Sequence, residues 1–309
     1  MWFIGKPVIN IKEYFNRINH LLKSEKYFMD DKFIEEIDYN IKRIEKFLDY
    51  ELDNEVIPKE VREGIKQILP YFNLFQKNLK KINKDLIIQR FDELIKNYSS
   101  IFKVHLSYLL RHPEPDKQSY TNHSLRHLSK SGVGQAKEFS ERLSELILLS
   151  PEPIDLLIYT SKNKRAHLFS DILIRRMKKN KINLNEEINL NFAEEEILTN
   201  TFVTHSLKKY LENKYDQYDK NTLVENFRDY LIDWLKNSKE RALICNEITN
   251  FVNTTVKRNH TNRLNITLMF THLPNIACYF NKMGFDIEKA LNFEPADYII
   301  YLNSRLVKI

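Results

Sequence analysis

Apolar residues recur at three- and four-residue steps through much of residues 1–100, a spacing that predicts amphipathic helices. The clearest set runs from Phe33 to Leu52. A less regular set runs from Ile65 to Phe75, and Pro70 within it is expected to kink or end the helix. This part contains no cluster of catalytic residue types. We therefore expect an all-α N-terminal domain that packs on the following domain or binds a protein partner.

The pattern changes near residue 101, where apolar runs of strand length begin to alternate with helical segments. Such alternation predicts a three-layer α/β/α domain over residues 101–309, with a mainly parallel sheet. Residues 199–260 are mostly helical and long for a connection, so we expect a helical cap insertion there. The predicted strands are Val104–Leu110, Leu156–Tyr159, Ile182–Ile188, Ile266–Phe270 and Tyr298–Leu302, and the predicted helices are 133–148, 164–179, 222–237 and 239–257.

Composition narrows the class of protein. Only five glycines and 29% charged residues in 309 suit a helix-rich globular chain. Two cysteines form no disulfide framework, and the N-terminus lacks the basic segment of a signal peptide, so a cytoplasmic location is expected. No apolar run is long enough to span a membrane, so no membrane partner is expected. The net charge of +6 permits anionic partners, but the basic run 175–181 lacks interleaved aromatics, so nucleic acid is not expected.

Residues suited to anion binding follow three of the predicted strands. Because parallel strands end at one edge of a sheet, these side chains are expected to converge. Arg side chains offer planar, charge-assisted donors for phosphate, and a helix N-terminus adds free N–H groups. The residues are Arg111 and His112 after the first strand, Thr160, Ser161 and Arg165 after the second, and His272 after the fourth.

Each of these signals is weak by itself. A second Arg-His pair, Arg126-His127, has no strand before it, and Arg165 or His272 alone would be ordinary helix and core residues. The pattern Leu128-Ser129-x-x-Gly132-x-x-Gln135-Ala136 is more specific and describes a loop that turns into a helix. Four elements in this order, each in a fitting context, are much harder to obtain by chance.

Together the motifs resemble the histidine phosphatase superfamily, in its phosphoglycerate mutase-like branch, over residues 104–305. In that family a strand ends in Arg-His-Gly and Leu-Thr-x-x-Gly-x-x-Gln-Ala follows, while later strands end in Thr-Ser-x-x-x-Arg-Ala and Thr-His. The resemblance implies that His112 is a nucleophile and forms a phosphohistidine that water hydrolyses, with no metal or other cofactor. The residues that it assigns to substrate binding are Arg111, Arg165, His272, Thr160, Ser161 and Glu114.

The chain departs from the family pattern in two places. Pro113 replaces the Gly after Arg-His, which removes a backbone donor and fixes φ. The late motif reads Thr-His-Leu-Pro rather than the His-Asp of the acid phosphatase branch, so the general acid is expected in the loop after the third strand. Glu194 is the first candidate for this acid and Glu195 the second. The run Glu194–Glu196 is equally typical of a helix start with favourable charge.

His123 and His127 are four residues apart, as two metal ligands on a helix would be. The residues around them are typical of a loop, and no third ligand has a suitable spacing. We therefore predict no metal site.

The sequence thus predicts a phosphoric monoester hydrolase of the histidine phosphatase type, acting on a phosphorylated small molecule or phosphoprotein. The alternative is a phosphate-binding or scaffold protein with weak or no turnover, in which residues 1–100 dock a partner. Pro113 and the altered acid loop favour this alternative. The presence of both arginines and both histidines of the motifs favours the enzyme.

Overall fold

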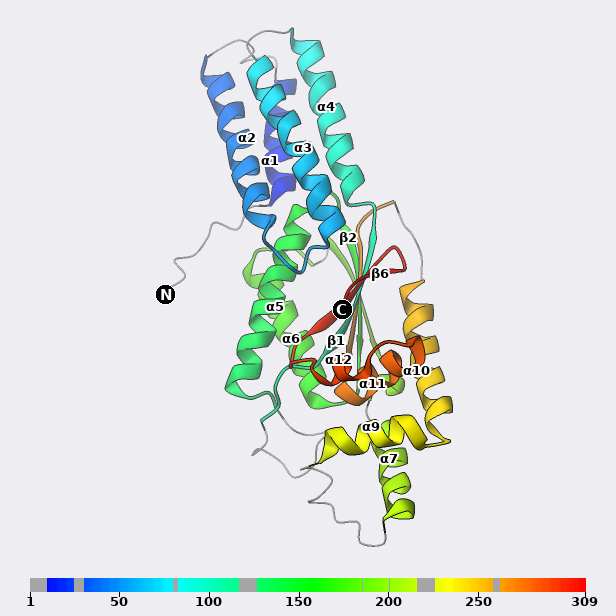
Figure 1. The fold of residues 1–309 in the computed structure, drawn as a ribbon. Coiled ribbons are helices and arrows are strands. Elements are labelled where there is room, and N and C mark those ends of the chain that lie inside the picture. The colour runs from blue at the N-terminus through cyan, green and yellow to red at the C-terminus, as the bar shows by residue number, and fades with distance from the viewer. Residues whose placement is uncertain are drawn as a thin grey trace.

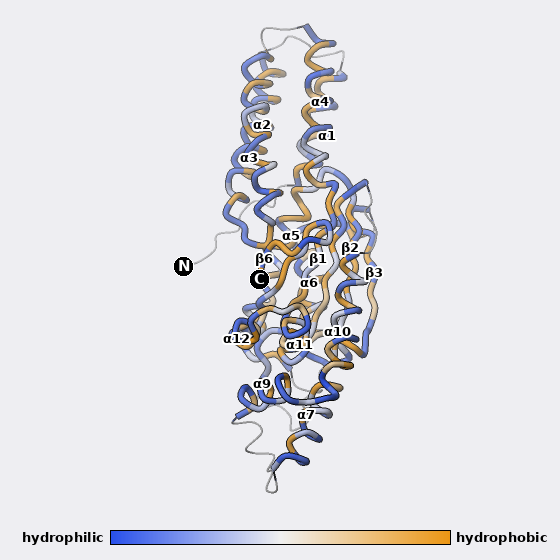
Figure 2. The backbone as a smooth tube through the Cα atoms, turned by 45° about the vertical axis from the view of Figure 1, so that its right-hand side comes forward, coloured by the Kyte–Doolittle hydropathy of each residue, from blue (hydrophilic) through white to orange (hydrophobic). Residues whose placement is uncertain are grey.

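The computed structural model describes residues 10–24, 31–79, 83–116, 127–184, 186–199, 201–215, 226–257 and 262–309. Four helices form one end of the molecule (Figure 1). They are α1 (Ile11–Lys23), α2 (Asp31–Glu51), α3 (Lys59–Asn78) and α4 (Lys84–Ile101). Hydrophobic and hydrophilic stretches alternate along them (Figure 2), as amphipathic helices require. The predicted all-α N-terminal region is confirmed.

Pro70 lies inside α3 and does not end it, so of the two effects expected from the sequence, a helix end at this residue is excluded. The ring removes one backbone donor, which leaves the carbonyl of Lys66 without its helix partner. Both residues are exposed, so water can hydrate that carbonyl at little cost. The buried side of the same helix, with Ile68 and Phe72, holds it in the bundle.

A six-stranded sheet forms the centre of the rest of the chain, in the order β3-β2-β4-β1-β5-β6. The first four strands in this order are parallel, β5 pairs with β1 in the antiparallel sense, and β6 pairs with β5 likewise. The strands are β1 (His105–Arg111), β2 (Ile154–Thr160), β3 (Ile188–Glu194), β4 (Asn265–Thr271), β5 (Tyr298–Leu302) and β6 (Arg305–Lys308).

Helices cover both faces of this sheet, which confirms the predicted three-layer fold (Figure 1). Along β1, Leu106, Tyr108 and Leu110 pack with the helices of one face, and Leu109 packs with those of the other. The first face carries α5 (Lys130–Leu149) and α6 (Lys164–Lys179). The other elements are the 3₁₀ helix η2 (Glu196–Leu198), α7 (Thr201–Lys214), α9 (Phe227–Asn237), α10 (Arg241–Val256), α11 (Leu273–Met283) and α12 (Ile287–Leu291).

The third strand was predicted at the wrong place, at Ile182–Ile188 instead of Ile188–Glu194. The apolar start of the predicted run belongs to the end of α6. Lys181 adopts a positive φ of 59°, and the backbone N–H of Ile182 donates back to the carbonyl of Met177 at 3.1 Å, which closes the helix. The real strand is an edge strand with several exposed residues, so it lacks an apolar run.

The other predicted elements between residues 101 and 309 lie within a few residues of their expected bounds. The predicted helix at 222–237 appears as α9 from Phe227, and residues 222–225 lie outside the described part. The short strand β6 was not predicted. Asn303 and Ser304, with φ of 46° and 67°, form the tight turn that pairs it with β5.

Helices α1–α4 share one hydrophobic cluster with α5, α6 and the near face of the sheet. Buried hydrogen bonds join the two parts, from Tyr98 Oη to the carbonyl of Leu149 at 2.7 Å and from Tyr108 Oη to the carbonyl of Val56 at 2.8 Å. Because β1 begins directly after α4, the four helices lie beyond the amino ends of the parallel strands. Figure 1 shows α7 and α9 at the opposite end of the sheet.

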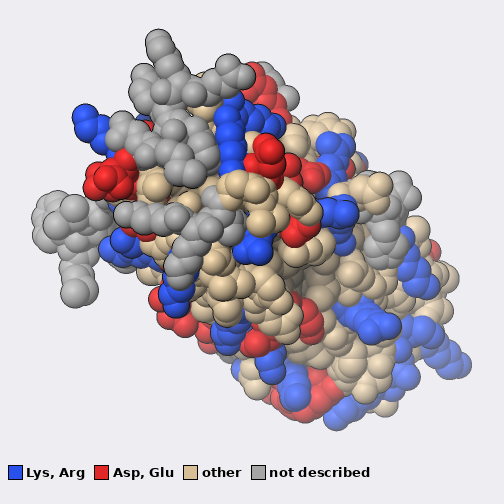
Figure 3. All heavy atoms as spheres, turned by 90° about the horizontal axis from the view of Figure 1, so that it is seen from above, with Lys and Arg blue, Asp and Glu red and all other residues tan. Residues whose placement is uncertain are grey.

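The division into a domain at 1–100 and a domain at 101–309 with a cap at 199–260 stays a prediction. Seen from the α1–α4 end, basic and acidic side chains are intermixed on the visible surface (Figure 3). In the part of the chain that the structure describes, no helix combines the length and the apolar character needed to cross a membrane.

Candidate active site

The parallel pairing of β1 with β4 brings His112 and His272 together. Arg111 pairs with Thr271 in the register of the two strands. The backbone N–H of His112 extends this ladder by donating to the carbonyl of Thr271 at 3.0 Å. The two imidazole rings lie with their centroids 4.7 Å apart, and the residues are only 6% and 1% exposed.

The environment of His112 makes it a neutral imidazole with a free ring nitrogen. Its Nδ1 lies 2.7 Å from the carbonyl oxygen of Pro113, which can only accept, so Nδ1 carries the proton. The structure gives Nε2 no partner within the described residues, and a neutral imidazole keeps a lone pair there. Burial, and then the positive charge of Arg165, hold the pKa of His112 well below its usual range.

Side chains that follow β2 surround His272 on the other side. Arg165, in the first turn of α6, places Nη2 at 3.1 Å from Nδ1 of His272. The Nε2 atom of the same ring lies 3.1 Å from Ser161 Oγ and 2.6 Å from Asn163 Nδ2. Burial, and then the nearby His112 and Arg165, lower the pKa of His272 well below its usual value.

Arg111 lies at the same edge, at the end of β1. Its Nη1 donates to the carbonyl of Phe293, and its backbone N–H donates to the carbonyl of Asp297 at 2.9 Å. Burial lowers the pKa of Arg111, against the opposite effect of Glu294 and Asp297. The positive charge of Arg228, on α9, lowers this pKa further, so α9 lies near this edge of the sheet.

At this edge, Nε of Arg111 and Oγ1 of Thr160 are buried and have no hydrogen-bond partner among the described residues. Buried donors nearly always have partners. An anion bound between the ends of β1 and β2 would supply acceptors for both. The arrangement of two guanidinium groups and two neutral imidazoles is therefore suited to a phosphoryl group.

The motif from Leu128 to Ala136 holds the loop that follows His112. Ser129 caps α5 through its Oγ, which accepts from the N–H of Gly132 at 2.9 Å and donates to Glu114 Oε2 at 3.2 Å. Gln135 Oε1 accepts from the backbone N–H of Glu114 at 3.0 Å. The motif therefore has a structural role. The contacts of Glu114 are with α5, and its predicted part in substrate binding stays a prediction.

Glu194 ends β3, where it pairs in register with Thr160. Its carboxylate is 49% exposed and lies 3.2 Å from His167 Nε2, and two strands separate β3 from β1. Glu195 follows, and its backbone N–H donates to the carbonyl of Thr160 at 2.8 Å. Of the three glutamates only Glu196 lies in a helical turn, η2. The role of Glu194 or Glu195 as acid stays a prediction.

Two asparagines contribute to the site although the sequence analysis gave them no role. Asn163 is one of the variable positions of Thr-Ser-x-x-x-Arg-Ala. Asn275 follows Thr-His-Leu-Pro, and its Nδ2 donates to the carbonyls of Ile197 at 3.1 Å and Thr199 at 3.0 Å. Thr271 Oγ1 donates to the carbonyl of Leu198 at 3.0 Å. These bonds anchor the segment after Glu194 to the start of α11. In the sequence, the available sign of these roles was that polar residues lie within or directly after the motifs.

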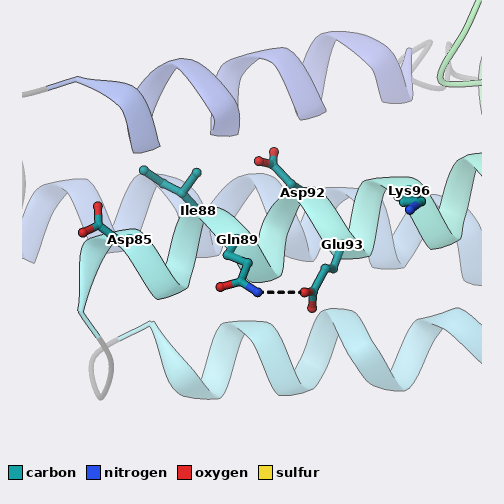
Figure 4. A pocket seen from close by; sticks show the side chains of 6 residues that line it. All are labelled: Asp85, Ile88, Gln89, Asp92, Glu93 and Lys96. Carbon is teal, nitrogen blue, oxygen red and sulfur yellow. Dashed lines mark hydrogen bonds between the residues drawn. The ribbon is translucent and has the colours of Figure 1, made fainter.

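A hollow of about 500 Å³ lies elsewhere, on α4 (Figure 4). Its lining holds carboxylates, with Gln89 Nε2 donating to Glu93 Oε1 at 3.1 Å, and no imidazole. It lies on the helical end of the molecule and takes no part in the site. The residues that line it are Asp85, Ile88, Gln89, Asp92, Glu93 and Lys96.

The prediction of no metal site rested on His123 and His127. His123 lies outside the described residues. Within the described ranges, no group of three or more His, Cys, Asp or Glu side chains is placed to hold a metal ion.

No protein-family model matches the chain, and no curated protein matches it significantly. Phosphoglycerate mutase from Bacillus anthracis str. Sterne is 13% identical with a TM-score of 0.42, over 68% of this chain and 93% of its own. Alpha-ribazole phosphatase from Shigella flexneri is 13% identical with a TM-score of 0.37, over 66% and 94%. The protein histidine phosphatase SixA complexed with tungstate is 10% identical with a TM-score of 0.31, over 66% and 94%.

These three solved structures are members of the histidine phosphatase superfamily, the family that the sequence motifs resemble. TM-scores this low establish no kinship by themselves.

We predict that Gly132→Ala damages the site whereas Gly134→Ala does not. A Cβ on Gly132 would overlap the carbonyl oxygen of Glu114, so the loop after His112 must shift. The expected cost is about 1–3 kcal/mol in the free energy of unfolding, with loss of phosphate binding. A Cβ on Gly134 meets no atom within 4 Å, so that variant is neutral or gains up to about 1 kcal/mol. Urea unfolding and phosphate titration of both variants test this, and equal behaviour would contradict it.

A second prediction concerns pH. His112 and His272 are neutral in the folded chain because their pKa values are lowered, whereas in the unfolded chain they take up protons near the usual value of 6.5. Below that pH the unfolded state binds more protons, so stability is lost as the pH falls. Between about pH 6.5 and pH 5, each imidazole should remove about 1–2 kcal/mol of unfolding free energy.

The measurement is urea unfolding across this pH range for wild type, His112→Gln and His272→Gln. Each variant should lose less stability on acidification than wild type. Equal pH slopes in all three proteins would show that the imidazoles are not held neutral.

Proposed function

We propose that this chain is a histidine phosphatase that hydrolyses phosphomonoesters through a phosphohistidine on His112, without a metal ion. The observation that carries the proposal is the state of His112. Its Nδ1 proton is directed to the carbonyl of Pro113, so the lone pair of Nε2 is available in a buried site beside two guanidinium groups. Pro113 lacks the N–H of the family's Gly but keeps the carbonyl that orients the ring.

The proposed reaction has two displacements at phosphorus. Nε2 of His112 forms a bond to phosphorus while the bond to the ester oxygen breaks, and the leaving oxygen takes a proton. Water then attacks the phosphohistidine and releases inorganic phosphate, which restores the free imidazole. Splitting one difficult displacement into two easier ones is the general advantage of covalent catalysis.

Arg111, Arg165 and His272 are the proposed clamp for the phosphoryl oxygens. Phosphoryl transfer depends mainly on positioning and on stabilising negative charge, which preorganised donors in a dry site do well. The guanidinium of Arg165 already contacts His272, and burial strengthens its interaction with an anion. Thr160 and Ser161 are proposed to complete the donor set.

Glu194 is the proposed general acid, with Glu195 as the second candidate. Glu194 lies at the carboxyl edge of the sheet, on a segment that Thr271 and Asn275 anchor. Its contact with His167 leaves the carboxylate half exposed, so a substrate's leaving group can approach it from solvent.

A phosphorylated small molecule or phosphoprotein is the proposed substrate, with selection by α9 and its neighbours, since Arg228 lies close to Arg111. The α1–α4 end is remote from this edge, so its proposed role is protein docking rather than substrate selection. A cytoplasmic location remains part of the proposal. The alternative of a phosphate-binding scaffold predicts binding without turnover.

Hydrolysis of para-nitrophenyl phosphate with EDTA present tests the proposal. Wild type should turn over, and His112→Ala should lose activity by about a thousandfold or more, because the nucleophile is missing. The matched control is His127→Ala, which removes the imidazole of the second Arg-His pair and should retain activity. Equal activity of wild type and His112→Ala would refute the nucleophile, and phosphate binding without turnover would favour the scaffold alternative.

The proposed acid predicts a dependence on the leaving group. Glu194→Gln should slow hydrolysis of an alkyl phosphate by about a hundredfold or more, and that of para-nitrophenyl phosphate much less, because nitrophenolate leaves without a proton. Glu195→Gln is the matched control and should behave like wild type. If the two variants exchange these results, Glu195 is the acid. If neither shows the dependence, the acid lies elsewhere.

A further inference from the structure

The side chain of Asn163 is placed in an unusual way for its position in the chain. It is the residue that begins α6, where an Asn side chain commonly accepts a hydrogen bond from the first turn of the helix. It makes no such bond. Instead its amide lies 2.6 Å from Nε2 of His272 and the residue is 7% exposed.

Both nitrogens of His272 face an N–H group, Arg165 at Nδ1 and the amide nitrogen of Asn163 at Nε2, whereas a neutral ring offers a lone pair at only one of them. Nδ1 faces Arg165 Nη2 at 3.1 Å, and a guanidinium can only donate. In the empty site Nδ1 must therefore hold the lone pair and Nε2 the proton. Ser161 Oγ can accept from Nε2, and Asn163 can do so only by presenting its amide oxygen.

An anion at the site reverses this requirement. The unprotonated oxygens of a phosphoryl group only accept, so when Arg165 donates Nη2–H to such an oxygen, a second one beside His272 needs a proton on Nδ1. Nε2 then holds the lone pair, and Ser161 and the amide nitrogen of Asn163 must donate to it. Asn163 Nδ2 lies 2.6 Å from Nε2, and a turn of the amide about its Cβ–Cγ bond brings the oxygen to the same place, so the side chain can serve either state.

We propose that Asn163 is a positioning residue for His272, with an amide that accepts from Nε2 in the empty site and donates to Nε2 once an anion binds. The proton of His272 thereby moves from Nε2 to Nδ1 without leaving a buried polar group unpaired. A side chain that only accepts or only donates would fix His272 in one tautomer. This inference rests on the proposed function in one respect, because it takes the bound anion to be a phosphoryl group.

Histidine nitrogen NMR on the full chain tests the inference. Long-range proton–nitrogen correlation of the ¹⁵N-histidine protein gives the tautomer of His272, and its signals are assigned by their loss in His272→Gln. At neutral pH the empty wild type should carry the proton on Nε2. Saturation with inorganic phosphate should move it to Nδ1. A proton on Nδ1 in the empty site, or one that stays on Nε2 with phosphate bound, would overturn the inference, as would the absence of any phosphate-dependent change.

Asn163→Asp supplies the matched variant. A carboxylate has a similar shape and is also favoured at a helix start, but it only accepts. It should keep the proton on Nε2 and raise the dissociation constant for phosphate by about tenfold or more, the cost of one charge-assisted hydrogen bond. Asn73→Asp on the exposed side of α3 adds the same charge away from the site and should match wild type. If Asn163→Asp moves its proton as wild type does, Asn163 has no such role.

Turnover of para-nitrophenyl phosphate in the same samples separates this inference from the proposed function. A proton shift without turnover refutes hydrolysis and leaves the role of Asn163 standing. Turnover without a proton shift refutes the role of Asn163 alone.

Discussion

The meeting of the two histidines in the candidate site depends on the parallel pairing of β1 with β4. Arg111 pairs with Thr271 in this register, so the residues that follow, His112 and His272, lie side by side. The hydrogen bond from the backbone N–H of His112 to the carbonyl of Thr271 fixes the position of His112 along β4. A slip of one residue would turn the side chains of one strand to the other face of the sheet. Burial of both strands on both faces prevents such a slip, because each face fills a separate hydrophobic cluster.

Burial then sets the chemistry of the two imidazoles. A charged imidazole loses solvation in the core and is repelled by Arg165, so both rings stay neutral. A neutral ring has one donor and one acceptor nitrogen, so its hydrogen-bond partners decide which nitrogen is free. The carbonyl of Pro113 makes this choice for His112, and the guanidinium of Arg165 makes it for His272. Hydrogen bonds anchor the loop after His112 to α5 and the segment after Glu194 to α11, which holds both segments in place at the site.

The strands and helices that carry the site were predictable because buried strands are continuous apolar runs and motifs mark their ends. The third strand was not, because an edge strand keeps polar residues and the nearby Ile182 serves to close a helix. The contact of Asn163 with His272 spans 109 residues, and Asn163 is a variable position of its motif, so only the folded chain reveals it. Glu194 and Glu195 lie at the same edge of the sheet because they follow one another at the end of β3, each beside Thr160.

The central claim is that His112 becomes phosphorylated, and trapping this species tests it most directly. Wild type would be denatured in alkali during turnover of para-nitrophenyl phosphate, because phosphohistidine is stable in base and lost in acid. Peptide mass spectrometry would then locate the phosphoryl group. The account predicts a phosphoryl group on His112 that disappears after acid treatment. Turnover with no phosphorylated His112, or with the phosphoryl group on another residue, would contradict it.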